Sequence, residues 1–120
     1  MPRVTLRCPG KAMLADGTIV DIIVHDVSRD GLQIRCDKAA AVAIHPSAKP
    51  IEEKQGAPKL KMQFDVPLSS GPATVKARGR LMYFALISAD VAAFGVRFQS
   101  VSREGVEILQ SVISAALEPG

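Results

Sequence analysis

The segment from Asp26 to Gly31, with the sequence DVSRDG, holds the residues of this chain best suited to bind a ligand. It carries a carboxylate and a hydroxyl two residues apart, and two arginines, Arg3 and Arg7, precede it. A carboxylate accepts hydrogen bonds from both the N1 and the exocyclic N2 donors of guanine, whereas adenine has no such pair of donors on its Watson–Crick edge. Arginine guanidinium groups bind phosphate bidentately and stack on purine faces. The combination predicts a receptor for a guanine base that carries a phosphate.

The flanking residues indicate how this segment is held. Residues 18–24 and 32–36 are rich in Ile, Val and Leu, which predicts a strand, a tight turn and a second strand. Since side chains alternate along a strand, Asp26 and Ser28 should project to the same side while Val27 points away. The turn is expected to face solvent.

Two points about this turn stay open at the level of sequence. Asp26 and Ser28 either contact a ligand or only stabilise their own turn, as Asp and Ser often do. Arg29 either reaches the same ligand or is simply exposed. Gly31 can adopt a left-handed turn conformation without steric cost.

The pattern Asp-x-Ser-x-x-Gly after an N-terminal arginine cluster resembles the PilZ domain family, whose members are receptors for cyclic di-GMP. Residues 78–83 (RGRLMY) and 94–98 (FGVRF) are similar to a late strand of that family and to its closing strand before a C-terminal helix. The resemblance implies a bacterial, mainly β domain and a cyclic di-GMP site. The site residues that it implies are Arg3, Arg7, Asp26, Ser28, Arg29 and Gly31.

The arginine pair fits the family pattern in two ways. Arg3 and Arg7 have the Arg-x-x-x-Arg spacing, and could act together as a pair shifted along the chain. Alternatively, Pro2-Arg3 resembles the Pro-Arg of the family, which makes Arg3 the second arginine and places the first before Met1. Arg3 lies 23 positions before Asp26, and Arg7 lies 19 before it.

The remaining elements predict a small antiparallel β-barrel of six or seven strands with a C-terminal α-helix. A strand over 11–15 ends at an Asp-Gly hairpin signal, residues 59–66 alternate cleanly, and strands over 73–86 and 91–99 follow. Residues 38–56 are expected to form a long connection with a short helical turn. From Ser102, a credible N-cap, the period changes to that of a helix. This helix is expected to pack its apolar stripe across an open end or face of the sheet. The stripe comprises Val106, Leu109, Val112, Ile113, Ala116 and Leu117.

Composition sets the broad class of the protein. The 120 residues suit a single domain over 1–120, and no apolar run approaches the length needed to span a bilayer. The first residues hold no signal-peptide pattern, so a cytoplasmic location and no membrane insertion are expected. Cys8 and Cys36 lack a zinc-site spacing and are expected to serve as small apolar side chains. The net charge of +3, with basic residues spread along the chain, permits a polyanionic partner without requiring one.

Other classes of function fit the residues less well. Strand alternation should place His25 on the face opposite Asp26 and Ser28, which excludes a catalytic triad, and His45 has no companion metal ligands. No phosphate-cradling glycine loop occurs, so no enzymatic activity, metal or cofactor is expected. With no Trp, one Tyr and four Phe, of which Phe64, Phe94 and Phe98 should face the core, the chain lacks a stacking platform for a nucleic acid polymer.

The expected function is therefore a cyclic di-GMP receptor or adaptor. Ligand binding would order the N-terminal arm and change a surface that a protein partner of unknown identity reads. The alternative is a protein-interaction module of the same fold that does not bind the nucleotide.

Overall fold

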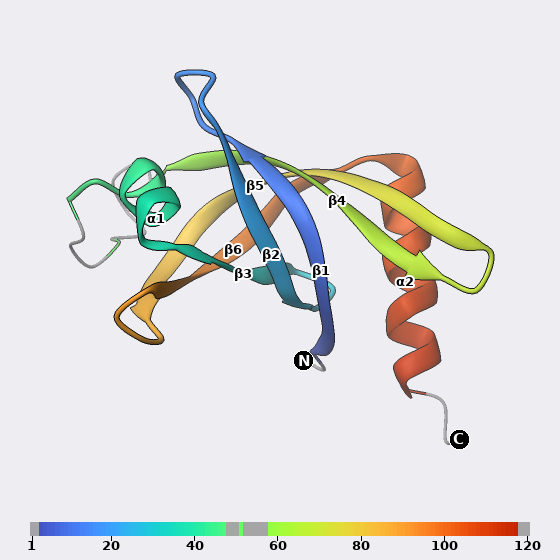
Figure 1. Cartoon of the computed structure of the whole chain (residues 1–120). Coiled ribbons are helices and arrows are strands. Elements are labelled where there is room, and N and C mark those ends of the chain that lie inside the picture. Colours follow the sequence, from blue (N-terminus) through green and yellow to red (C-terminus); the bar gives the residue numbers. More distant parts are fainter. Residues whose placement is uncertain (1–2, 48–50, 52–57, 118–120) are drawn as a thin grey trace.

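The structure, a computed structural model, describes residues 3–47, 51 and 58–117. Six strands and two helices make up the described chain (Figure 1). In chain order they are β1 (Val4–Met13), β2 (Ile19–Val27), β3 (Gly31–Asp37), α1 (Lys38–Ile44), β4 (Lys59–Leu68), β5 (Gly71–Leu86), β6 (Val91–Val101) and α2 (Arg103–Leu117). The expected mainly β architecture with a C-terminal helix is confirmed.

The six strands form a closed antiparallel barrel in the order β1-β2-β3-β6-β5-β4. β1 pairs with β2 over most of its length and with β4 from Gly10 to Met13, which closes the barrel. The predicted hairpin between β1 and β2 is confirmed: Asp16 Oδ1 accepts a hydrogen bond of 2.9 Å from the Thr18 backbone N–H. This bond also lowers the pKa of the exposed Asp16 carboxyl group.

The core follows the alternation of the strands. Leu60, Met62, Phe64 and Val66 of β4 all point inward and are buried, as their spacing predicts. β2 and β3 contribute their own inward faces from Val20 to Val24 and from Leu32 to Cys36. Phe94 is fully buried and packs against Phe84 at a ring-centroid distance of 5.2 Å. Phe98, expected in the core, is only partly buried.

The connection after β3 begins with α1, a helix of seven residues rather than a single turn. Asp37 is its N-cap, and its carboxylate accepts a hydrogen bond of 2.8 Å from the Ala40 backbone N–H. Ile44 anchors the helix in the core. The rest of the connection, residues 48–50 and 52–57, lies outside the described residues. Within the described ranges, neither helix is long and apolar enough to span a bilayer.

The C-terminal helix α2 packs less completely than its sequence predicts. Ser102 caps it as expected, since its Oγ accepts a hydrogen bond of 3.1 Å from the Gly105 N–H. Leu109 is buried, but Val106 is 40% and Leu117 59% exposed. The helix lies beside the barrel and contacts β5 and β1 (Figure 1). The expectation that the helix packs its apolar stripe against the sheet is therefore met only for part of the stripe, because a convex barrel wall covers only part of a helix face.

Both cysteines serve as core side chains. Cys8 and Cys36 are free thiols, 2% and 8% exposed. Burial raises the pKa of both thiols, and that of Cys36 reaches about 11. Both are therefore protonated and unreactive at neutral pH, which agrees with the apolar role predicted for them.

Replacing Phe64 or Leu109 by Ala should destabilise the protein by about 2–5 kcal/mol, because each side chain is buried and leaves a cavity. Val106→Ala is the matched control on α2 and should cost under about 1 kcal/mol, since Val106 is largely exposed. Urea unfolding followed by circular dichroism measures all three. A loss at Leu109 no greater than that at Val106 would show that α2 does not dock through Leu109.

Candidate functional site

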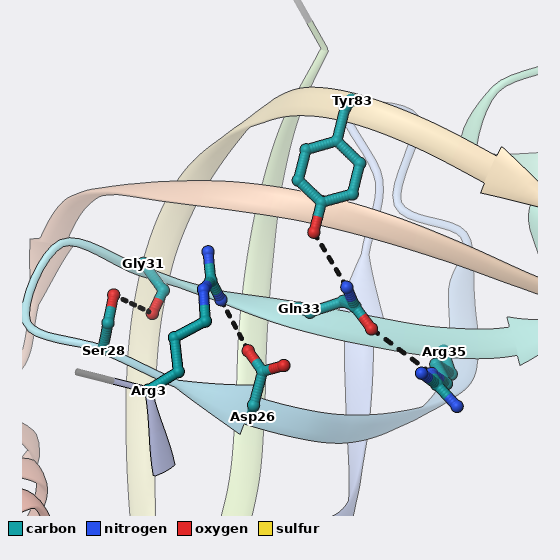
Figure 2. Close-up of polar contacts among 7 residues, drawn as sticks. All are labelled: Arg3, Asp26, Ser28, Gly31, Gln33, Arg35 and Tyr83. Atoms are coloured by element: carbon teal, nitrogen blue, oxygen red, sulfur yellow. Dashed lines mark hydrogen bonds and ion pairs between the residues drawn. The ribbon is translucent and has the colours of Figure 1, made fainter. Parts of the chain in front are cut away.

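An ion pair joins the start of the chain to the end of β2. Thr5 lies opposite Asp26 in the β1–β2 ladder, which brings Arg3 beside Asp26. The Arg3 guanidinium donates a hydrogen bond of 2.5 Å from Nη1 to Asp26 Oδ1 (Figure 2). The Asp26 side chain is 15% exposed and that of Arg3 47% exposed, so the pair lies on the outer wall with its carboxylate largely enclosed. The structure therefore brings together two of the predicted site residues.

The turn after β2 is closed by Ser28 and Gly31. The Ser28 backbone N–H donates to the Gly31 carbonyl at 2.8 Å, and Ser28 Oγ donates to the same oxygen at 3.3 Å. Ser28 is only 6% exposed, so the expectation that it projects into solvent is wrong. A serine hydroxyl has one hydrogen, and here that hydrogen is used within the turn. Ser28 thus shapes the turn beside Asp26 and Arg3.

Gly31 has a different role from the one its position in a turn predicts. It is the first residue of β3 and is not among the residues with positive φ; within the described chain the positive-φ glycines are Gly17 and Gly71. A Cβ atom at Gly31 would lie 2.1 Å from the Val96 carbonyl oxygen. Glycine is therefore required here by the close approach of β6.

Arg7 lies in a bulge of β1. The pairing with β2 passes from Thr5↔Asp26 to Cys8↔Val24, so two residues of β1 face one residue of β2. Arg7 has φ 52°, a left-handed conformation that is uncommon for a residue with a side chain. It is exposed, and within the described part of the chain its side chain makes no ion pair. Arg7 thus follows Arg3 closely in the chain, but its side chain is not bound to the Arg3–Asp26 pair.

Arg29 is exposed at the tip of the turn, next to α2. Ser28 and Arg29 line a hollow of about 290 Å³ whose other wall is formed by α2, including Leu109 and Ile113. The Ser28–Gly31 turn therefore lies next to the partly exposed apolar side of α2.

A second bulge, in β2, changes the direction in which the His25 side chain points. The β2–β3 register shifts between Val24 and Asp26, so alternation is broken at His25. Val24 and Val27 both point inward, and His25 and Asp26 between them are both partly exposed. The expected placement of His25 and Asp26 on opposite faces is wrong. The Ser28 hydroxyl donates to the Gly31 carbonyl and Asp26 binds Arg3, and among the described residues no hydrogen bond joins either of them to His25.

Sequence reasoning missed a polar row that continues the site across the barrel wall. Asp26 is opposite Gln33, Gln33 is opposite Gly95, and Gly95 is opposite Tyr83. Gln33 Nε2 donates to the Tyr83 hydroxyl at 2.8 Å, and Arg35 Nε donates to Gln33 Oε1 at 3.3 Å (Figure 2). An ordered phenol, amide and guanidinium therefore adjoin the Arg3–Asp26 pair.

Gly95 makes this row possible. A Cβ atom at this position would lie 1.9 Å from Cε2 of Tyr83, so the ring lies directly over the Gly95 backbone. The glycine of the FGVRF segment can be recognised in the sequence. Only the pairing of β5 with β6 shows that Tyr83, the one tyrosine of the chain, faces this glycine. In the neighbouring row Arg80 is opposite Arg97, and its Nε is buried with no hydrogen-bond partner among the described residues.

Comparison with known proteins identifies the fold. No family model matches the chain, and no curated protein matches it in sequence. Solved structures do match: the Bacillus subtilis inhibitor of motility MotI/DgrA aligns with a TM-score of 0.69 at 8% identity over 96% of this chain and 49% of that one. The K. pneumonia protein MrkH in its apo state aligns at 0.63 and 12% identity over 96% and 49%. The PilZ domain of YcgR from Escherichia coli, solved with c-di-GMP, aligns at 0.58 and 19% identity over 96% and 91%.

The chain has the PilZ-domain fold. It spans about half the length of the MotI/DgrA and MrkH chains and nearly all of the YcgR domain. No group of three or more His, Cys, Asp or Glu side chains within the described part of this PilZ-like barrel could hold a metal ion.

Gly95→Ala should destabilise the PilZ-like barrel by about 1–3 kcal/mol, because the new methyl group displaces the Tyr83 ring. In a Tyr83→Ala background the same change should cost little, since the ring is gone. Urea unfolding of the wild type, the two single variants and the double variant measures this coupling directly. Equal costs in both backgrounds would show that Tyr83 does not lie over Gly95.

Proposed function

We propose that the protein binds cyclic di-GMP on the outer wall of its barrel and acts as a receptor or adaptor domain. The observation that carries this proposal is the Arg3–Asp26 ion pair, which sets a guanidinium and a carboxylate side by side at the Ser28–Gly31 turn. The likeness of the fold to the YcgR domain that was solved with c-di-GMP supports the same ligand.

Asp26 selects guanine in this proposal. An ionised carboxylate has two oxygens and about four lone-pair sites, so the pair with Arg3 uses only part of its capacity. Asp26 therefore accepts the N1 and N2 hydrogens of a guanine while it holds Arg3 in place. Arg3 in turn presents its remaining N–H groups to a phosphate of the same ligand.

The turn gives the ligand a fixed frame. Ser28 and Gly31 hold the backbone of the turn, and the exposed Arg7 and Arg29 supply further positive charge. Because the turn lines a hollow against α2, a ligand that shifts the turn, or holds the N-terminal arm more firmly at Arg3, changes the surface at the helix. That surface is the one a protein partner would read.

Isothermal titration calorimetry with cyclic di-GMP tests the proposal. The wild-type protein should bind, and Asp26→Ala and Arg3→Ala should each weaken binding about ten- to a hundred-fold, since each removes a charge-assisted hydrogen bond. Lys38→Ala, an exposed cation on α1, is the matched control and should bind like wild type. Cyclic di-AMP should not compete. Wild-type affinity for Asp26→Ala would contradict the assigned role of the carboxylate.

Two variants compare how much Arg3 and Arg7 contribute to the affinity for cyclic di-GMP. Arg3→Ala should weaken cyclic di-GMP binding more than Arg7→Gly, because Arg3 is held at Asp26 and Arg7 is not. Glycine suits the left-handed backbone at position 7, so Arg7→Gly removes the guanidinium without a folding penalty. Titrations at low and high salt should show a smaller salt dependence for Arg7→Gly. A larger loss at Arg7 than at Arg3 would mean that Arg7 is the main phosphate ligand.

One observation favours the second candidate, a protein-interaction module without nucleotide binding. α2 leaves Val106 and Leu117 substantially exposed beside the hollow at Arg29. Apolar helix surface of this kind is suited to a protein partner. If calorimetry detects no cyclic di-GMP binding by the wild-type protein, this candidate replaces the first.

A further inference from the structure

The barrel gathers cations on one side that the sequence spreads out. β4, β5 and β6 together carry six Lys or Arg residues and one carboxylate, Asp65. The Asp65 carboxylate accepts a hydrogen bond from the Thr74 hydroxyl at 2.7 Å. These three strands therefore hold an excess of five positive charges, which is larger than the net charge of +3 of the whole chain.

The register places several of these cations together. Lys61 is opposite Arg78, and Arg78 is opposite Ser100. In the next row Lys76 is opposite Gln63, and Gln63 is opposite Lys11 of β1. Cross-strand neighbours on one face lie about 5 Å apart between Cβ atoms, so these residues form a compact cluster.

A hollow of about 610 Å³ lies within this cluster. Lys11, Lys61, Lys76 and Arg78 line it, with Ser100 and Ser102. Lys11 forms an exposed ion pair with Asp21. Within the described residues the other three cations have no carboxylate partner. Like charges held this close repel one another, and an anionic partner relieves that repulsion.

The hollow also has an apolar part. Met13 and Ile19, the last and first residues of β1 and β2, line it and are 38% and 58% exposed. They pair with each other at the hairpin end of these strands, whereas Val4 and Val27 pair at the end that carries Arg3 and Asp26. Met13 and Ile19 of the basic hollow thus lie at the end of the β1–β2 ladder opposite the candidate nucleotide site.

We propose that this hollow docks an acidic segment of a protein partner that inserts one or two apolar side chains. Carboxylates of the segment bind Lys61, Lys76 and Arg78, and its apolar side chains cover Met13 and Ile19. The barrel is closed, so the segment binds through side chains and adds no strand to the sheet. This surface is separate from the candidate nucleotide site and does not depend on it.

The apolar part of the hollow favours a protein segment over a phosphate polyanion. A chain of phosphates gains nothing from Met13 and Ile19, and bases need aromatic side chains on which to stack. No aromatic residue lines the hollow, and Tyr83 is bonded to Gln33 in the row next to the nucleotide site. Charge and apolar surface together therefore match an acidic peptide with apolar anchors.

Fluorescence anisotropy with defined probes tests this docking site on the full chain. A short labelled peptide that repeats Glu-Glu-Leu should bind, and Lys61→Glu and Arg78→Glu should each weaken its binding about three- to ten-fold. Lys38→Glu makes the same charge change away from the hollow and should leave binding unaltered. Ile19→Ser should weaken the Glu-Glu-Leu peptide and leave a Glu-Glu-Ser peptide of equal length unaffected. Circular dichroism checks that each variant is folded.

Three results would overturn the proposal. The first is no binding of the Glu-Glu-Leu peptide to the folded wild-type protein. The second is an equal loss for Lys38→Glu and Arg78→Glu, which would mean attraction by overall charge alone. The third is tighter binding of a single-stranded oligothymidine than of the peptide with the same sensitivity to Arg78→Glu, which would make the hollow a phosphate site.

Discussion

The pairing of β1 with both β2 and β4 is the constraint on which the rest of the structure depends. Its contact with β4 closes the barrel, and its contact with β2 brings Arg3 and the start of β1 against the end of β2. Arg3 therefore meets Asp26 across 23 residues of sequence as a consequence of the pairing of β1 with β2. Without this pairing the arginine would lie on an unpaired end, where termini are usually mobile.

Much of the fold could be predicted from local patterns, because alternation, turn residues and helix period act over a few residues. The clean alternation of β4 and the Ser102 cap are examples. The wrong expectations concern contacts between distant elements. Ser28 is buried in a turn where both its N–H and its hydroxyl bond to the Gly31 carbonyl of β3, and α2 is half exposed because the barrel wall is convex. Bulges at Arg7 and His25 shift registers that strict alternation would keep.

Some residues of the candidate site could likewise be predicted from local sequence, and others could not. Arg3, Arg7, Asp26, Ser28, Arg29 and Gly31 could be named from one motif and its spacing. Gln33, Tyr83 and Gly95 could not, since they come from three strands and become neighbours only through the β3–β6 and β5–β6 pairing. The basic hollow could not be predicted for the same reason. Its cations are dispersed in the sequence and become neighbours only through the register of the strands. A modest net charge therefore hides a strongly polarised surface.

A nuclear magnetic resonance titration of the ¹⁵N-labelled protein with cyclic di-GMP tests the central claim most directly, because it shows where on the barrel the ligand binds. The account predicts that amide shifts concentrate at Arg3, in the turn from Ser28 to Gly31 and at Gln33, with smaller changes in the part of α2 that faces the turn. The amide chemical shifts of Lys61, Lys76 and Arg78 should not change. Shifts centred on those three residues, or no shifts at the Ser28–Gly31 turn at saturating ligand, would contradict it.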